Sequence, residues 1–181
     1  MKTIIFVLAM VSFGIGALKA SSGGNQKEIS AGIVIGGKDE PGEPMIVHGT
    51  VYAEDGTTPV PGIIVHVYHT DTEGNYRRKS DGPGDPRLQG TMKTNANGEY
   101  KYRTIKPGSY PSTRNPAHVH YVLSGMGYSK QYDELMFEGD PFLTERAVGD
   151  SRKLGTFGTI RPLEREEDGM LRCRKDVRLK K

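Results

Sequence analysis

The sequence of 181 residues contains a single cysteine, Cys173, and no tryptophan. One thiol excludes an intramolecular disulfide and any structural zinc site that needs two or more thiolates from this chain. A metal ion would therefore be held by His, Tyr, Asp or Glu side chains. The formal net charge of +3 is too small and too scattered along the sequence to indicate a nucleic-acid-binding protein.

Long hydrophobic runs are also missing, apart from one at the start of the chain. Lys2 precedes the small and apolar run Ile4–Ala17, and small residues follow as far as Gly24. The run is too short to cross a bilayer, and its layout is typical of a secretory signal. We therefore expect residues 1–20 to be a signal peptide, the protein to be exported to a periplasmic or secreted location, and the chain to have no membrane span.

Glycine and proline are abundant, with 24 and 11 residues, which disfavours long helices and favours short strands joined by turns. Residues 21–44 are predicted to form a flexible N-terminal arm that lies over another surface, and residues 45–181 a single domain. Seven or eight short strands at regular spacing indicate an all-β, antiparallel β-sandwich with long loops and little helix. One short helix is expected within Asp140–Leu154. The predicted strands include Ile46–Tyr52, Gly62–His69, Gly90–Thr94, Glu99–Thr104, Ala117–Ser124, Gln131–Phe137, Thr156–Pro162 and Met170–Leu179.

The five histidines differ in what their spacing permits. Side chains two residues apart on a strand point to one face, whereas side chains three apart point to opposite faces. His118 and His120 can therefore converge on one ion, with Val119 on the opposite face. His66 and His69 cannot, and these two together with His48 are interpreted as surface or hydrogen-bonded histidines.

Two tyrosines stand on loops near these histidines in the sequence order. Tyr76 follows a turn after the second strand, and Tyr110 lies in a Pro/Gly loop eight residues before His118. Two phenolate oxygens and two imidazole nitrogens form a donor set that suits a trivalent iron ion. Taken singly, each tyrosine is better interpreted as a half-buried aromatic residue at a strand end, with its hydroxyl in water.

Together these residues place the sequence beside a known family. Tyr76, the loop of Tyr110 and the segment Pro116–Tyr121 resemble the intradiol ring-cleavage dioxygenases, and the chain is most similar to the β-type chain of protocatechuate 3,4-dioxygenase. Further segments carry the same resemblance, namely Thr94–Tyr100, Arg103–Ile105, Phe137–Pro141 and Met170–Leu179.

The resemblance implies a non-haem Fe(3+) held by Tyr76, Tyr110, His118 and His120. It implies that a catechol or protocatechuate-like substrate binds there and that O2 is inserted between its two hydroxyl-bearing carbons, giving a muconate-type diacid. Tyr110 is then the catalytic tyrosine that leaves the metal and takes up a proton. The resemblance also leaves open whether the chain works alone or as a homo-oligomer.

The sequence departs from the family at the positions around this set. The family usually has Arg three residues before the first histidine, where this chain has Asn115, and the candidate catalytic arginine, Arg114, stands one residue earlier. Glu134 occupies the place of a family glutamine, so that Asn115 and Glu134 are candidate substrate-binding residues. Tyr68 stands where the family often has tryptophan.

Two other functions remain open. The Gly49–Tyr110 part also resembles carboxypeptidase regulatory-like β-sandwiches, which are secreted binding modules without catalysis. Residues 106–121 discriminate between the two readings, because only the iron protein requires the Tyr and His-x-His set. The departures at Asn115 and Glu134 leave a slow, catechol-binding iron protein as the other alternative.

Overall fold

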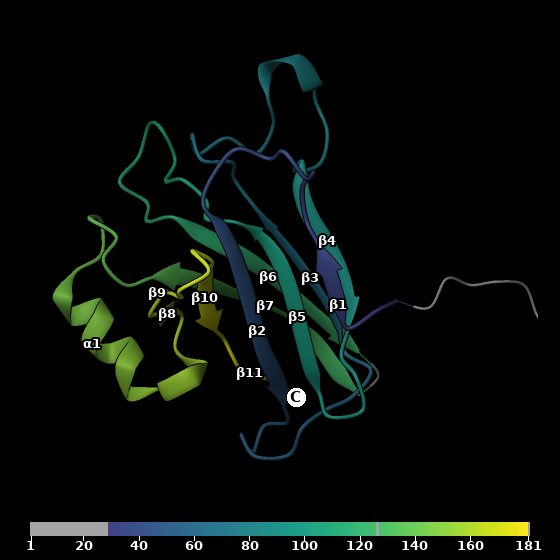
Figure 1. Cartoon of the computed structure of the whole chain (residues 1–181). Helices are drawn as coiled ribbons and strands as arrows, with labels where there is room; N and C mark the ends of the chain where they lie inside the picture. The colour runs from purple at the N-terminus through teal and green to yellow at the C-terminus, as the bar shows by residue number, and fades with distance from the viewer. Residues whose placement is uncertain (1–28, 126, 181) are drawn as a thin grey trace, which may run out of the picture.

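Two β-sheets stacked face to face, with one α-helix at their side, make up the fold of the computed structural model, which describes residues 29–125 and 127–180 (Figure 1). The predicted signal peptide, residues 1–20, lies outside the described residues. In the first sheet the strands follow the order β1-β5-β2-β10-β9, with β11 also paired to β2, and in the second the order β4-β3-β6-β7-β8. The strands of the first sheet are β1 (Gly32–Val34), β2 (Pro44–Tyr52), β5 (Glu99–Ile105), β9 (Glu164–Arg165), β10 (Leu171–Arg174) and β11 (Val177–Arg178), and those of the second are β3 (Ile64–His69), β4 (Leu88–Lys93), β6 (His118–Gly125), β7 (Tyr128–Phe137) and β8 (Ile160–Arg161).

Alternation of side chains along the strands builds the core between the sheets. In β3, Val65 and Val67 are fully buried while Ile64, His66 and Tyr68 lie on the outer face. Strand β5 follows the same two-residue period, as a strand with one buried face must. The predicted β-sandwich with little helix is therefore confirmed.

The long central strands pair antiparallel, as expected, and short parallel pairs at the margins make both sheets mixed. Strand β1 runs parallel to β5, both β10 and β11 run parallel to β2, and β8 runs parallel to β7. Each parallel partner is a short segment near the start or in the last part of the described chain, and a long stretch of sequence separates it from the strand with which it pairs. A parallel pair needs a crossover connection rather than a tight turn, and these long connections are hard to assign from the sequence.

The helix and the hairpin agree with the sequence analysis. Helix α1 (Glu145–Lys153) begins after Thr144, whose side chain accepts a hydrogen bond from the Ala147 amide at 3.2 Å. Gly98 takes a φ of 72° in the turn between β4 and β5, as the Asn-Gly signal requires. Between the helix and β8 the chain forms the 3-10 turn η2 (Gly155–Phe157), so the strand predicted over Thr156–Pro162 is reduced to two residues.

The described part of the N-terminal arm lies against the first sheet and the loops at its end. Its strand β1 pairs with β5, and Ile35 is 4% exposed. Beyond it, Glu40 reaches a loop that follows β3. The sequence contained no alternation long enough to predict this strand.

A buried ion pair joins the two sheets. The side chain of Lys175, which follows β10, is 0% exposed, and its Nζ lies 2.9 Å from Oδ2 of Asp133 on β7. The same ammonium donates to the carbonyl oxygens of Phe157 and Gly158 at 3.2 and 3.3 Å. Cys173 is buried beside it in β10, and burial raises the pKa of its thiol to about 12, so this thiol has little thiolate character at neutral pH.

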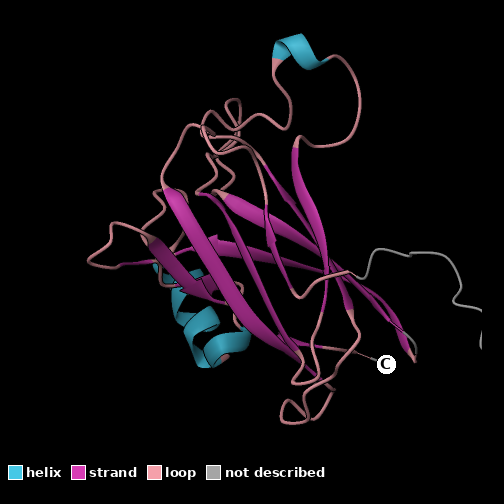
Figure 2. Cartoon of the chain, turned by 45° about the vertical axis from the view of Figure 1, so that its right-hand side comes forward, coloured by secondary structure: helices cyan, strands magenta, loops and turns pink. Residues whose placement is uncertain are grey.

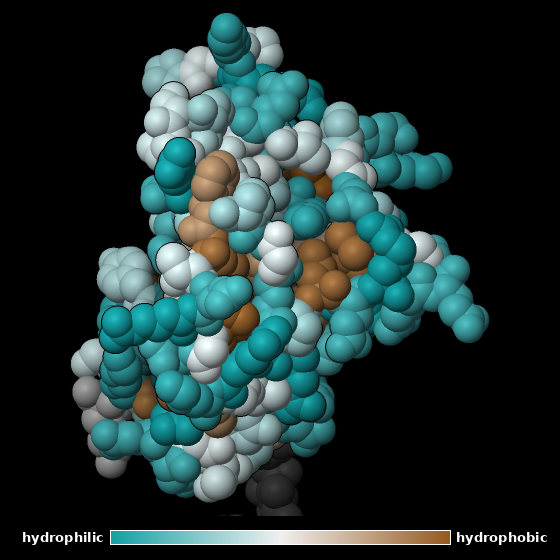
Figure 3. All heavy atoms as spheres, turned by 90° about the vertical axis from the view of Figure 1, so that its left-hand side faces the viewer, coloured by the Kyte–Doolittle hydropathy of each residue, from teal (hydrophilic) through white to brown (hydrophobic). Residues whose placement is uncertain are grey.

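The loops at one end of the sandwich stand away from the sheets. Figure 2 shows the loop between β3 and β4, with the 3-10 turn η1 (Lys79–Asp81), extending beyond the strand ends. The face that carries α1 is mainly hydrophilic, with hydrophobic atoms visible in recesses between polar side chains (Figure 3). Among the described residues, no helix is long and apolar enough to cross a membrane.

Candidate metal centre

His118 and His120 lie at the start of β6, on the outer face of the second sheet. Val119 between them is 0% exposed and points into the core. The Nε2 atoms of the two imidazoles are 3.0 Å apart. The strand thus brings the two histidines together on one face, as their spacing predicted.

Two loops bring tyrosine hydroxyls to the same point. Tyr76 follows β3 and Tyr110 precedes β6, and their phenolic oxygens are 2.5 Å apart. The Tyr76 oxygen lies 2.8 Å from Nε2 of His120, and the Tyr110 oxygen lies 3.2 Å from Nε2 of His118. Two oxygens and two nitrogens from three separate segments therefore cluster, and each of these atoms lies 2.5–3.4 Å from at least two of the others.

Glycines allow the two tyrosine loops to approach this closely. A Cβ atom on Gly74 would lie 2.0 Å from the carbonyl oxygen of Ser109, and one on Gly108 would lie 2.3 Å from that of Thr72. Gly74 also takes a φ of +81°, which L side chains rarely adopt. The amide of Gly108 donates to the Asp71 carbonyl at 2.8 Å. Backbone is packed against backbone here, so the positions of Tyr76 and Tyr110 depend on each other.

The donor set fits a cation better than it fits a hydrogen-bonded cluster. Nδ1 of His118 lies 2.7 Å from the Pro116 carbonyl oxygen, which can only accept, so this nitrogen carries the proton of the neutral ring. Nδ1 of His120 lies 3.5 Å from a carboxylate oxygen of Glu134, whose negative charge favours a proton on this nitrogen. Both Nε2 atoms then present lone pairs to each other at 3.0 Å, and a shared positive ion would relieve that repulsion.

The phenols lead to the same conclusion. Burial, followed by the hydrogen bond with Tyr110, raises the pKa of Tyr76 above its usual value. Burial and the neighbouring His118 lower the pKa of His120, against the opposing effect of Glu134. A neutral imidazole, and a phenolate whose charge a neighbouring cation stabilises, are the forms in which these side chains bind a metal ion. The four residues therefore fit a ferric ion.

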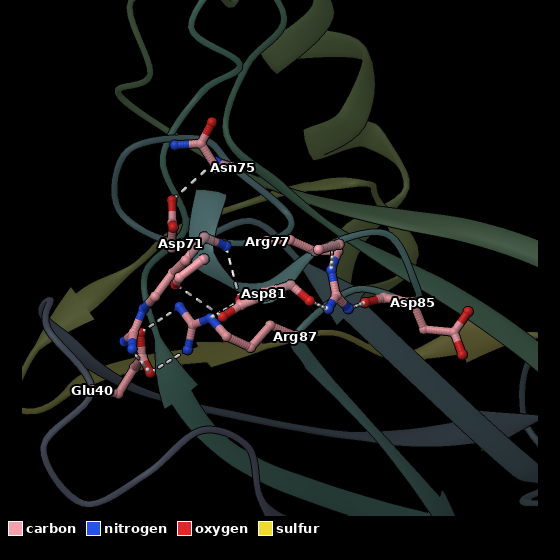
Figure 4. Close-up of polar contacts among 10 residues, drawn as sticks. Glu40, Asp71, Asn75, Arg77, Asp81, Asp85 and Arg87 are labelled. Carbon is pink, nitrogen blue, oxygen red and sulfur yellow. Dashed lines mark hydrogen bonds and ion pairs between the residues drawn. The ribbon is translucent and has the colours of Figure 1, made fainter.

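The loop that carries Tyr76 is held by a polar network (Figure 4). Arg77 donates to three carbonyl oxygens of the same loop, those of Asp81, Gly82 and Asp85, at 2.5–2.7 Å. Arg87, at the end of the loop, donates from its amide to the Tyr76 carbonyl at 2.9 Å. The guanidinium of Arg87 forms a bidentate pair with Glu40, with distances of 2.5 and 2.8 Å.

This network links the N-terminal arm to a candidate metal ligand. The side chain of Glu40 is only 8% exposed, and hydrogen bonds from Arg87 lower its pKa below the usual value despite the opposing effect of burial. The sequence analysis missed Glu40, Arg77 and Arg87. Adjacency of Arg77 to Tyr76 was the only local signal, because Glu40 and Arg87 are 47 residues apart.

Asp140 fixes the segment that leads into β6. Its two carboxylate oxygens accept from the amides of Ala117 and Phe142, each at 2.9 Å. The backbone immediately before His118 is thereby tied to the loop after β7. The segment Phe137–Pro141, which carries part of the family resemblance, thus helps to position the first histidine of the pair.

Beside His120 lies a hollow of about 330 Å³, which is also lined by Tyr68, Tyr132, Glu134 and Thr159, among others. The Tyr68 ring stacks on His120 with the ring centroids 4.6 Å apart and an angle of 20° between the planes. Tyr68 also lines a neighbouring hollow of about 650 Å³ along the outer face of the same sheet. The hollow thus adjoins one of the four donors, His120, and Tyr68 gives it an aromatic wall.

Arg114 and Asn115 are not brought into this hollow. Both are exposed and lie in the loop between Tyr110 and β6. Within the described residues, Arg114 forms no hydrogen bond or ion pair, and the amide of Asn115 donates to Thr113 Oγ1 at 3.3 Å. Glu134, in contrast, lines the hollow.

The histidines interpreted as non-ligands lie elsewhere: His48 is on the outer face of the first sheet, His66 contacts Thr91, and His69 is buried between the Thr70 carbonyl and Thr104.

A larger hollow of about 690 Å³ lies on the outer face of the first sheet. It is lined by His48, Lys101, Arg172 and Arg174, among others, and its two arginines are paired with Glu166, Asp168 and Asp176. None of the four donor residues lines it. The candidate site is thus confined to the second sheet and the loops above it.

Comparison with known proteins assigns the family. A family model described as "Dioxygenase" matches residues 22–179. Catechol 1,2-dioxygenase 1 of Acinetobacter lwoffii is 32% identical over 123 residues, which cover 58% of this chain and 39% of that protein. The protocatechuate 3,4-dioxygenase beta chain of Burkholderia cepacia is 36% identical over 113 residues, which cover 56% of this chain and 48% of that one. The chain belongs to the intradiol ring-cleavage dioxygenase family.

Solved structures show the same fold. A catechol 1,2-dioxygenase from Acinetobacter sp. ADP1 aligns with a TM-score of 0.65 and 20% identity, over 85% of this chain and 58% of that chain. The dioxygenase domain of a dioxygenase carbohydrate-binding protein fusion from Streptomyces sp. SirexAA-E aligns with a TM-score of 0.63 and 21% identity, over 90% of this chain and 94% of that domain. The aligned part of this chain spans about two-fifths to one half of the length of the curated relatives named above.

Proposed function

We propose that this protein is a non-haem ferric intradiol dioxygenase that cleaves a catechol between its two hydroxyl-bearing carbons and gives a muconate-type diacid. The observation that carries the proposal is the set of four donor atoms from Tyr76, Tyr110, His118 and His120, each of which lies 2.5–3.4 Å from at least two of the others. Family membership supports the same reaction. O2 and a small catechol are the substrates, and Fe(3+) is the resident metal.

The four residues would hold the ion through two phenolate oxygens and two Nε2 atoms. When bound, ferric iron supplies Lewis acidity that draws electron density from the catecholate ring and makes it reactive toward O2. The Pro116 carbonyl accepts a hydrogen bond from Nδ1 of His118, and the nearby Glu134 carboxylate favours the proton on Nδ1 of His120, so that both Nε2 lone pairs are left for the metal. Outer-face residues of β3 and β7 form the walls of the adjoining hollow.

We assign unequal roles to the two tyrosines. Tyr76 is fixed through the Arg87 amide and the arginine network of its loop. Tyr110 is followed by five exposed residues, Pro111–Asn115. Tyr110 is therefore the residue free to move out of the donor set, and its phenolic oxygen is the group that takes up a proton from a catechol hydroxyl.

Arg114 and Asn115 remain candidates for a further role in catalysis and substrate binding. Their loop is exposed, so a bound substrate would have to draw one of them toward the hollow. Comparison of Arg114→Ala with Asn115→Ala tests this role: a loss of turnover in one variant with unchanged iron content assigns the role to that residue.

A catechol-binding iron protein with little turnover is the second candidate function. Two observations favour it. Arg114 is exposed and does not line the hollow, so it supplies no positive charge there, and the Glu134 carboxylate places a negative charge where an anionic ligand would bind. O2 consumption in the presence of catechol separates this candidate from the enzyme.

The test of the proposed function is the visible spectrum of the iron-loaded protein with and without catechol. A tyrosinate-to-iron charge-transfer band that shifts when catechol is added, together with O2 uptake, is the expected result. In Tyr76→Phe or His118→Ala, iron affinity should fall at least about tenfold. A protein that takes up no ferric iron and stays colourless contradicts the proposal.

We also propose export, on the basis of residues 1–20. The prediction is checked by expressing the full chain and sequencing the N-terminus of the product found outside the cytoplasm. Recovery of the chain only in the cytoplasm, with Met1–Ala20 still attached, contradicts it.

A further inference from the structure

Glu134 contacts the candidate ligand His120 from the neighbouring strand. The two residues stand directly opposite each other in the β6–β7 pair. Oε1 of Glu134 lies 3.5 Å from Nδ1 of His120, the ring nitrogen opposite to the one that faces the tyrosines. The carboxylate thus acts on the outer side of the imidazole and is not itself part of the donor set.

On its other side, Glu134 faces the hollow. Its side chain is 42% exposed, so the carboxylate is available to a ligand in that hollow. Asp133, the other acidic residue of the lining, is occupied by the buried ammonium of Lys175 at 2.9 Å. Glu134 therefore determines the sign of the charge that a ligand meets.

No cation offsets that charge within the described lining of the hollow, which contains neither lysine nor arginine. The nearest basic side chain on β7, Lys130, lies 5.3 Å from the centroid of the Tyr132 ring and lines the neighbouring hollow instead. Arg114 is exposed and forms no ion pair among the residues that the structure describes. A carboxylate on a bound catechol would consequently face Glu134 without a compensating group.

We propose that Glu134 is both a positioning residue for His120 and the specificity-determining residue of the site, which selects catechols with a neutral or cationic ring substituent and rejects carboxylated ones. The inference rests on the proposed function and narrows its substrate class. Like charges in a partly exposed hollow repel each other, whereas an ammonium substituent is attracted to the same carboxylate.

The experiment is an anaerobic titration of the full iron-loaded chain, followed by the charge-transfer band. The probes are catechol, 3,4-dihydroxybenzoate and 3,4-dihydroxybenzylamine, which differ in the charge of one substituent. We expect the benzoate to bind at least about tenfold more weakly than catechol, which corresponds to about 1.4 kcal/mol. The benzylamine should bind at least as tightly as catechol.

Glu134→Gln removes the charge and keeps the shape and an oxygen acceptor for His120. The ratio of the benzoate to the catechol dissociation constant should fall at least about fivefold in this variant. The matched control is Glu164→Gln, on β9 of the other sheet, which removes the same charge and should leave the ratio unchanged. A wild-type protein that binds benzoate and catechol equally, or a ratio that Glu134→Gln does not change, overturns the selectivity.

The positioning role has its own measurement in the iron-free protein. Glu134→Leu removes the acceptor, and we expect the His120 ring to lose its preference for the Nδ1–H tautomer in a ¹H–¹⁵N correlation spectrum, with iron affinity lower by about 10- to 100-fold. Unchanged tautomer and iron affinity in this variant overturn the positioning role. If the wild-type protein gives no charge-transfer band with any of the three probes, the proposed function itself fails, a result distinct from a band that responds equally to all three.

Discussion

Replacement of Gly74 by alanine should force apart the two loops that carry the tyrosines. The new Cβ would lie 2.0 Å from the Ser109 carbonyl oxygen, far inside the contact distance that real Cβ atoms show. Ser109 immediately precedes Tyr110. The backbone must therefore shift by about an ångström, and the shift acts directly on the distance between the two phenolic oxygens.

The expected magnitude has two parts. An L residue at a φ of +81° costs about 1–2 kcal/mol, as for other left-handed positions. Forcing the Cβ into packed backbone costs about 1–3 kcal/mol more. Together these give a loss of about 2–5 kcal/mol in the free energy of unfolding, and the displaced ligand should lower iron affinity at least about tenfold.

Gly169→Ala is the matched control. Gly169 has a φ of +77° and no atom within 4 Å of a new Cβ, and its amide closes a turn with Glu166 just as the Gly74 amide closes one with Asp71. The control should lose only the conformational part, about 1–2 kcal/mol, and keep its iron affinity. Denaturant unfolding and ferric-ion titration of both variants measure the difference. Equal losses in the two variants, or full iron affinity in Gly74→Ala, would refute the reasoning.

Three further outcomes follow from contacts away from the donor atoms. Glu40→Gln should weaken the pairing of residue 40 with Arg87, which holds the Tyr76 loop, and lower the free energy of unfolding by about 2 kcal/mol, between the values for exposed and buried ion pairs. Urea unfolding measures this loss, and a loss below about 0.5 kcal/mol contradicts a stabilising role for the pair. Burial lowers the pKa of His69 to about 4, whereas the pKa in the unfolded chain is about 6.5. The free energy of unfolding is therefore highest above about pH 6.5 and should fall as the pH drops toward about 4, by up to about 1.4 kcal/mol per pH unit. The same loss at acid pH in His69→Gln contradicts this assignment. Lys175→Met should cost about 3 kcal/mol because it leaves Asp133 unpaired, and the double variant with Asp133→Leu should recover much of that loss in thermal unfolding.

The sequence allowed the sandwich and the histidine pair to be predicted because both depend on short-range patterns. A two-residue period defines which face of a strand is buried, and the same period placed His118 and His120 together while Val119 entered the core. The loops of Tyr76 and Tyr110 could be named through the resemblance of their motifs. Their distance from the histidines could not be obtained from spacing alone, because it depends on the contact of Gly74 with Ser109.

Features that depend on long-range contacts escaped prediction for the same reason. The strand β1, the parallel pairing of β10 with β2, and the pair of Glu40 with Arg87 all join segments far apart in the chain. Local composition carries no signal for such partners. Glu134 was noted as an unusual acid, but only the pairing of β6 with β7 places it against His120.

The facing nitrogens of His118 and His120 would couple the stability of the fold to a bound metal ion. Their Nε2 atoms are 3.0 Å apart, and a cation held between them would offset the repulsion of their lone pairs. By mass action, a ligand that binds only the native state stabilises it by about 2.7 kcal/mol at one hundred times its dissociation constant. A redox-inert trivalent ion such as Ga(3+) should therefore raise the melting temperature without supporting turnover, so the gain in thermal stability would report on the metal site separately from the reaction.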